Sequence, residues 1–200
     1  MSEHVILFGG PMGAGKTTAI QSLSETRVIA TEAANSDRGT SNKPTTTVAL
    51  DYGTILLGGG LSEDGDGDTQ DELVRLYGIP GQRRFDFMWK VLKRRATGMV
   101  LLVHNDAPRP FEAMLEFLEE FGDLYDRGGI VVGVTRTDVS NRPLLPDYSE
   151  VIETVYPNRL IPVFAVDPRS AASMRLALMT LIANVEMRAM FRRVTQEVPA

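Results

Sequence analysis

The sequence predicts a layered α/β fold with a mostly parallel, six-stranded sheet, one antiparallel edge strand and helices on both faces. Short apolar runs recur at spacings that leave room for a helix between them. The segment between the first two runs has the pattern of a hairpin, and amphipathic stretches follow the later runs. The 200 residues, 43% of them hydrophobic, suffice for a single compact domain over residues 1–200.

The predicted strands are of two kinds. Runs that are apolar on both faces are typical of parallel strands covered by helices, and they occur as HVILF (4–8), MVLLV (99–103), IVVGV (130–134) and LIPVF (160–164). Between the first two runs, residues 45–57 and 73–78 form two extended segments around a glycine- and acid-rich stretch without helical period. These segments predict an antiparallel hairpin at one edge of the sheet.

Amphipathic helices are expected after these strands, because apolar residues recur there at helical spacing. They lie at about 84–96, 111–126, 147–155 and 171–193, and a helix-compatible segment, TTAIQSLSE, begins at residue 17. We interpret the apolar stripe of the last helix as core packing against the sheet.

Composition restricts the partners and the compartment. Lys and Arg number 21 against 26 Asp and Glu, a net charge of −5, so no basic field suggests nucleic acid or anionic membrane as a partner. The absence of cysteine rules out disulfides, thiol chemistry and a prenylation signal. With no signal-like start and no apolar run of membrane-spanning length, we expect a cytoplasmic protein without a membrane anchor of its own.

The clearest motif is GPMGAGKT at residues 10–17, which fits the phosphate-binding pattern G-x-x-x-x-G-K-[ST] between a strand and a helix. Its glycines allow successive backbone N–H groups to converge on phosphate oxygens at the positive end of the helix. Lys16 is expected to reach the β- and γ-phosphates, and Thr17 to bind Mg²⁺. The predicted phosphate-binding residues are Gly10, Gly13, Ala14, Gly15, Lys16, Thr17 and Thr18.

Two further segments, TTTVALDYG (45–53) and YGIPGQRRF (77–85), follow the phosphate loop in the order found in Ras-like small GTPases, which the chain resembles over about residues 4–190. The resemblance implies that Gly81 senses the γ-phosphate with its N–H and that Gln82 positions the attacking water. It also implies that Thr47 closes onto Mg²⁺ and the γ-phosphate, with Thr46 as the nearest alternative.

More narrowly, these two segments resemble a bacterial branch that includes the MglA-type polarity GTPases and the GTPases of conservon operons, in which Pro precedes the Gly-Gln pair. The resemblance implies a switch between GTP and GDP that requires Mg²⁺, with switch I at about 35–47 and switch II at about 80–92. The catalytic residues would then be Lys16, Thr47 and Gln82. It also implies a regulatory protein partner of the roadblock/longin type.

The chain departs from the Ras-like pattern at the metal site. Gly78 stands where most small GTPases have an aspartate that anchors the Mg²⁺ water shell. The bacterial branch shares this gap, and Asp51 on the neighbouring strand is the candidate replacement. The predicted metal residues are therefore Thr17, Thr47 and Asp51.

The base-reading segment also departs, since TRTD (135–138) replaces Asn-Lys-x-Asp. Asp138 can still accept two hydrogen bonds from guanine N1 and N2, donors that adenine lacks in that arrangement. Arg136 can cover the base with its guanidinium plane, whereas Thr135 is shorter than the usual Asn. The resemblance implies that Ala165, in FAVDPRS, offers a backbone N–H to guanine O6.

Several features have two interpretations. The polar residues that end MVLLV are either a catalytic cluster or a strand-end turn and helix cap. The strand-end residues are His104, Asn105 and Asp106. The hydrophobic residues of the proposed switch II either pack in the core or dock a partner, and they are Phe85, Phe87, Met88 and Trp89.

Three arginines are candidates for a stabilising charge in cis, namely Arg38, Arg83 and Arg84.

Two other functions remain open from the sequence. One is a P-loop phosphotransferase that uses ATP on a small substrate, against which Asp138 and the Pro-Gly-Gln segment argue. The other is an interaction module that binds nucleotide without hydrolysing it, which Gly78 favours and Gln82 disfavours.

Overall fold

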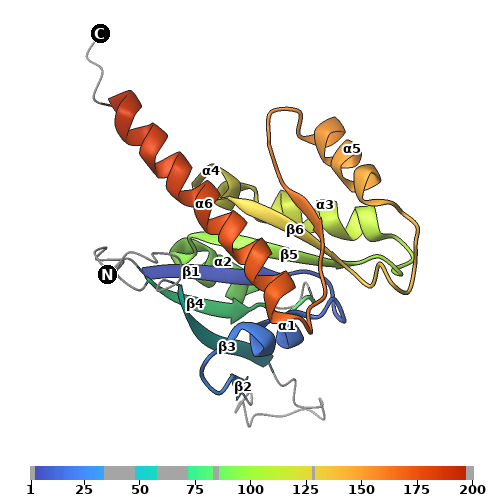
Figure 1. Cartoon of the computed structure of the whole chain (residues 1–200), viewed down its shortest axis with the longest axis horizontal. Coiled ribbons are helices and arrows are strands. Elements are labelled where there is room, and N and C mark those ends of the chain that lie inside the picture. Colours follow the sequence, from blue (N-terminus) through green and yellow to red (C-terminus); the bar gives the residue numbers. More distant parts are fainter. Residues whose placement is uncertain (1–2, 34–47, 58–71, 83–85, 128, 197–200) are drawn as a thin grey trace, which may run out of the picture.

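The computed structural model describes residues 3–33, 48–57, 72–82, 86–127 and 129–196 (Figure 1). Within them, seven strands form one sheet in the order β2-β3-β4-β1-β5-β6-β7. The strands are β1 Glu3–Gly9, β2 Ile29–Ala33, β3 Val48–Leu57, β4 Glu72–Gly78, β5 Gly98–His104, β6 Ile130–Thr135 and β7 Val163–Ala165.

The sheet is mostly parallel, as predicted, but the prediction of six strands with an antiparallel edge strand was wrong. β1 runs parallel to β4 and β5, and β6 parallel to β5 and β7, whereas β3 runs antiparallel to both of its neighbours. The additional strand β2 takes the edge, so β3 lies second from it. The sequence of β2, IATEA, is short and lacks an apolar alternation, and pairing with β3 stabilises it as a strand.

The predicted hairpin is confirmed. β3 and β4 pair antiparallel from Asp51 opposite Gly78 to Leu57 opposite Glu72. The glycine- and acid-rich stretch that joins them, like switch I, lies outside the described residues.

The helices follow the predicted amphipathic segments with one main difference, and one predicted strand also begins later than expected. The helices are α1 Lys16–Leu23, α2 Asp86–Arg95, α3 Pro110–Glu120, α4 Gly122–Arg127, α5 Leu145–Val155 and α6 Ala171–Gln196. The single helix expected at 111–126 is divided at Phe121, whose backbone leaves the helical region and whose side chain is fully buried. The strand expected at 160–164 begins only at Val163, because Pro162 has no N–H to donate to a ladder.

Helices cover both faces of the sheet, with an apolar layer on each side (Figure 1). Alternation along β1 directs Ile6 and Phe8 toward α1 and α6, and Leu7 toward the opposite layer, which includes residues of α2, α3 and α5. The apolar runs of β1, β5 and β6 are therefore explained by strands that are buried on both faces, whereas β7, at the edge of the sheet, is only partly buried and Leu160 before it is exposed. No helix in the described part of the chain is long and apolar enough to cross a membrane.

Candidate functional site

The loop between β1 and α1 has a backbone that requires glycine. Gly10, Gly13 and Gly15 have φ values of 131°, 83° and 97°, a region that residues with side chains rarely adopt. A β-carbon on Gly15 would also lie 2.7 Å from Cγ of Pro168. The loop leads directly into α1, whose first N–H groups lack partners within the helix and can bind phosphate oxygens.

Lys16 is folded back into this loop. Its Nζ donates hydrogen bonds to the carbonyl oxygens of Gly10 and Pro11, each at 2.8 Å. Burial lowers the pKa of Lys16 to about 8, although the carboxylate of Asp51 partly offsets this shift. When a phosphate binds in this loop, its oxygens could replace these two carbonyl oxygens as hydrogen-bond acceptors of the Lys16 ammonium group.

Asp51 lies beside the phosphate loop, as the predicted metal role requires. Its Oδ2 accepts a hydrogen bond of 2.5 Å from Oγ1 of Thr17. Asp51 is buried on β3 directly opposite Gly78 on β4. A hydroxyl and a carboxylate are hard oxygen donors of the kind that Mg²⁺ prefers, so these two residues fit the ion. Thr47, the third predicted metal residue, lies outside the described residues.

The segment after β4 contacts the phosphate loop through its backbone. A β-carbon on Gly81 would lie 2.5 Å from the carbonyl oxygen of Gly10 and 2.8 Å from the backbone nitrogen of Met12. Next to it, Nε2 of Gln82 lies 3.5 Å from Sδ of Met12. The two residues predicted to sense phosphate and to position water therefore lie against the loop that contains Lys16.

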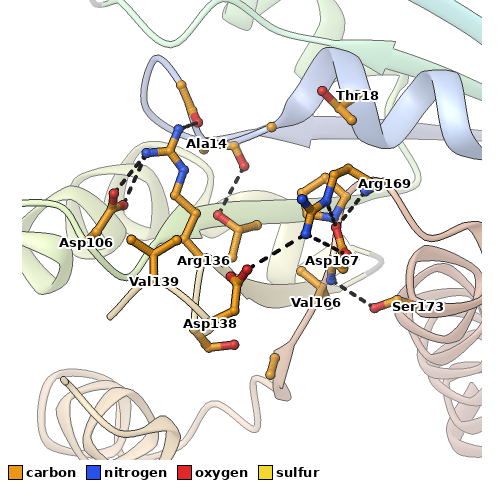
Figure 2. Close-up of a pocket in the computed structure, with 16 residues that line it drawn as sticks. Ala14, Thr18, Asp106, Arg136, Asp138, Val139, Val166, Asp167, Arg169 and Ser173 are labelled. Carbon is orange, nitrogen blue, oxygen red and sulfur yellow. Dashed lines mark hydrogen bonds and ion pairs between the residues drawn. The ribbon is translucent and has the colours of Figure 1, made fainter. Parts of the chain in front are cut away.

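The predicted base-reading segment contacts the phosphate loop at Gly13 and Ala14 (Figure 2). Thr135 is buried, and its hydroxyl donates to the carbonyl oxygen of Ala14 at 3.3 Å, so the shorter side chain still links β6 to the phosphate loop. Arg136 has a φ of 58°, and its guanidinium donates to Asp106 at 3.0 Å and to the carbonyl oxygen of Gly13 at 3.1 Å. In this conformation Arg136 is held along the loop.

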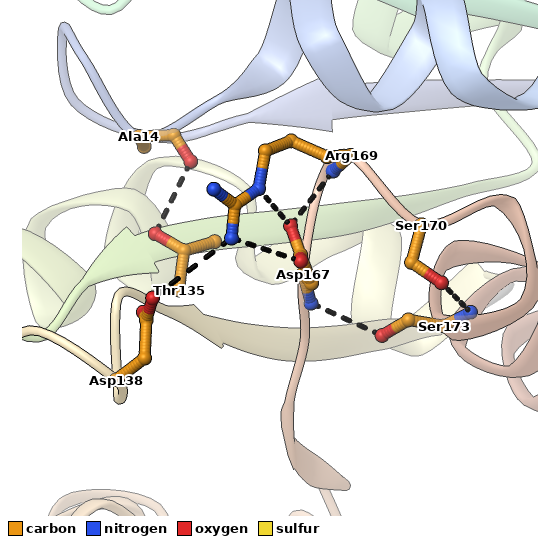
Figure 3. A network of polar contacts seen from close by, with 7 residues as sticks. All are labelled: Ala14, Thr135, Asp138, Asp167, Arg169, Ser170 and Ser173. Atoms are coloured by element: carbon orange, nitrogen blue, oxygen red, sulfur yellow. Dashed lines mark hydrogen bonds and ion pairs between the residues drawn. The ribbon is translucent and has the colours of Figure 1, made fainter.

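An ion network after β7 was missed by the sequence analysis (Figure 3). The carboxylate of Asp167 accepts two side-chain hydrogen bonds from Arg169, at 2.8 and 3.0 Å, and these bonds lower the pKa of Asp167. Nη2 of Arg169 also lies 3.8 Å from Oδ2 of Asp138. The only signal in the sequence was an acid and an arginine two positions apart in FAVDPRS, a spacing that has no fixed meaning.

These segments line an open pocket of about 750 Å³ at the carboxyl ends of the parallel strands, where ligands bind in such sheets. Eight of the predicted binding residues line it: Gly13, Ala14, Gly15, Thr18, Thr135, Arg136, Asp138 and Ala165. The others lie at the adjacent end of the phosphate loop, around Lys16. The structure therefore brings the predicted site residues that it describes into one continuous region.

Asn105, at the end of β5, supports this region from behind. It is buried, its amide donates to the carbonyl oxygen of Ser140 at 2.7 Å, and it accepts a hydrogen bond of 2.7 Å from the hydroxyl of Tyr148. These bonds fix the segment that follows Asp138. Of the two interpretations of this strand end, the structural one applies to Asn105, whereas Asp106 lines the pocket and binds Arg136.

The aromatic cluster of the proposed switch II is part of the core at Trp89. This side chain is buried, contacts the rings of Phe117 and Phe121, and donates from Nε1 to the carbonyl oxygen of Pro80 at 2.9 Å. Phe85 and the three candidate arginines Arg38, Arg83 and Arg84 lie outside the described residues, as does the side chain of Phe87.

The fold and the site together define an α/β nucleotide-binding protein of the P-loop type. A family model described as "Conserved hypothetical ATP binding protein" matches residues 26–185, and the chain belongs to this family. The match includes β2 and most of α6 but not the phosphate loop, whose assignment depends on its own motif and geometry. A search of curated proteins finds no match to the chain.

Proposed function

We propose that this protein is a Mg²⁺-dependent switch that binds GTP and hydrolyses it to GDP and phosphate in the cytoplasm. The observation that carries the proposal is the contact of Gly81 with the backbone of Gly10 and Met12. A γ-phosphate bound next to Lys16 would touch the phosphate loop and the segment after β4 together. Its removal would change the contacts of that segment, which is how a nucleotide-dependent switch II responds.

The proposed chemistry is in-line attack of water on the γ-phosphate. Lys16 leaves its two carbonyl partners to neutralise phosphate charge, and Gln82 orients the water from its position over the loop. Thr17 and Asp51 would hold Mg²⁺, which neutralises charge on the β- and γ-phosphates when it is bound. Thr47 as the switch I residue, membership of the MglA-type branch and a roadblock/longin regulator remain part of the proposal.

Guanine selectivity is proposed on the position of Asp138. Its exposed carboxylate lines the pocket beyond the phosphate loop and offers acceptors to guanine N1 and N2. Ala165 also lines the pocket, and its backbone N–H would donate a hydrogen bond to guanine O6. Arg169 must yield part of its contact with Asp138, which its bidentate bond to Asp167 allows.

ATP binding is a second candidate with its own support. The family description names ATP, and the ion pair with Arg169 offers a different partner for Asp138 than a guanine base. An ATP-dependent phosphotransferase would follow from this assignment, whereas a module that never hydrolyses its nucleotide is a separate alternative, whichever base is bound.

Competition of GTP, GDP and ATP for a fluorescent guanine nucleotide, with and without Mg²⁺, tests the proposal. We expect GTP and GDP to displace the probe, and ATP in large excess to leave it bound. Equal displacement by ATP would overturn the guanine assignment. Single-turnover assays on the purified chain then separate hydrolysis from binding, since a module without catalysis would return intact triphosphate.

A further inference from the structure

Three potential metal ligands meet at the amino end of the sheet, away from the phosphate loop. His4 begins β1 and Glu72 begins β4, whereas Glu186 lies on α6. Alternation places His4 on the same face of β1 as Ile6 and Phe8, and this face packs against α6. The register of β1 and β4 pairs His4 with Val74, so Glu72, two residues earlier, points to that face as well.

His4 is buried without a hydrogen-bond partner. The residue is only 8% exposed, and neither ring nitrogen has a hydrogen-bond partner among the described residues. The nearest carboxylate oxygen, Oε2 of Glu72, lies 3.6 Å from Nε2, which is too long for a hydrogen bond. Leaving a buried imidazole unsatisfied costs free energy, so this arrangement calls for a missing partner.

The geometry points to a bound divalent transition metal, and we propose that His4, Glu72 and Glu186 form a Zn²⁺ site. One ligand atom from each residue lies within 4.8 Å of the other two. Around a tetrahedral Zn²⁺, with bonds of about 2.0–2.2 Å to nitrogen and oxygen, ligand atoms are roughly 3.4 Å apart, so modest side-chain rotations close the site. Exposed Glu186 opens the site to solvent, and water completes the coordination.

Such a site would connect the last helix to the two central strands. Glu186 follows buried Val185, near the end of the apolar contact between α6 and the sheet. The ion would therefore stabilise the C-terminal part of α6 against β1 and β4. This role is independent of the proposed nucleotide function, because the site lies at the opposite end of β1 from the phosphate loop.

Isothermal titration of the full-length chain with Zn²⁺, in excess Mg²⁺, tests the site. We expect one bound Zn²⁺ and a higher melting temperature. Glu186→Gln, a change at an exposed position that preserves folding, should weaken Zn²⁺ binding at least about tenfold, as even loss of an outer partner does. The matched surface change Glu153→Gln and the phosphate-site change Asp51→Asn should leave binding intact. Unchanged binding in Glu186→Gln, or its loss in Asp51→Asn, would overturn the proposal.

The histidine content provides a second readout. The chain has two histidines, His4 and His104, so their ring nitrogens can be assigned separately by ¹⁵N NMR. We expect Zn²⁺ to shift the ring nitrogens of His4 and to leave those of His104 in place. A shift confined to His104, or no saturable binding at all, would show that the three residues do not form a zinc site.

Discussion

Asp51 on β3 and Gly78 on β4 are directly paired across the antiparallel ladder, and the aspartate occupies space that a side chain on the glycine would need. A β-carbon on Gly78 would lie 3.0 Å from both Cβ and Oδ2 of Asp51. A side chain at position 78 would therefore crowd the carboxylate of Asp51, which lies beside Thr17. This close packing gives a steric reason for a glycine at position 78.

Mg²⁺-dependent nucleotide binding should survive when the carboxylate is transferred from position 51 on β3 to position 78 on β4. We expect Asp51→Asn to weaken Mg²⁺-dependent nucleotide affinity by about tenfold to a hundredfold. The double change Asp51→Gly with Gly78→Asp should recover much of it, whereas Gly78→Asp alone should destabilise the fold by crowding two carboxylates. Affinity measured with Mg²⁺ and with EDTA checks this. If Asp51→Asn keeps the full Mg²⁺ effect, Asp51 is not a metal residue.

Nucleotide binding should depend on pH through Lys16. Its pKa is lowered from 10.5 to about 8 in the free protein, and bound phosphate favours the charged form. Binding should therefore take up about half a proton near pH 8, and affinity should fall as the pH rises above that value. Calorimetry in two buffers of different ionisation enthalpy measures the uptake. Equal affinities at pH 7 and pH 9 would contradict this assignment.

Base selectivity should depend on Asp138. Removing its charge with Asp138→Asn should reduce the preference for GTP over ATP by about tenfold to a hundredfold, the value of one charge-assisted hydrogen bond of about 1.5–3 kcal/mol. Arg169→Ala removes a competitor for the same carboxylate and should raise GTP affinity. Competition binding measures both. A GTP preference that survives Asp138→Asn would place base recognition elsewhere in the pocket.

Gly81 and Gln82 should have separable effects. Gly81→Ala forces a β-carbon against the backbone of the phosphate loop, so we expect it to reduce the affinity difference between triphosphate and diphosphate. Gln82→Ala should leave binding unchanged and slow hydrolysis about a hundredfold, the cost of a misplaced reacting group. Single-turnover rates at saturating nucleotide distinguish the two. Undiminished hydrolysis in Gln82→Ala would remove this residue from the mechanism.

The buried amide of Asn105 should contribute measurably to stability. Asn105→Ala leaves the hydroxyl of Tyr148 and the carbonyl of Ser140 without their partner, and we expect a loss of about 1–3 kcal/mol in the free energy of unfolding. Tyr148→Phe removes one bond of the same network and should cost less. Urea denaturation of the three proteins provides the comparison. A neutral Asn105→Ala would show that water replaces the amide.

The sequence by itself was enough for the fold class and for the phosphate loop. Runs such as MVLLV can be buried on both faces only in a sheet covered by helices, and the three glycines of the loop meet a backbone requirement within a few residues. The prediction that Gly81 and Gln82 lie next to the phosphate loop came from the order of the segments along the chain, which resembles that of small GTPases.

What the tertiary structure decided depends on contacts between distant residues. Strand β2 exists because β3 pairs with it, and Arg169 reaches the pocket because β7 brings Asp167 beside the segment of Asp138. The ring of His4 is likewise buried without a hydrogen-bond partner among the described residues because α6 packs over that face of the sheet. Local patterns report backbone preference and burial, whereas the partners of a polar side chain are set by how the elements pack.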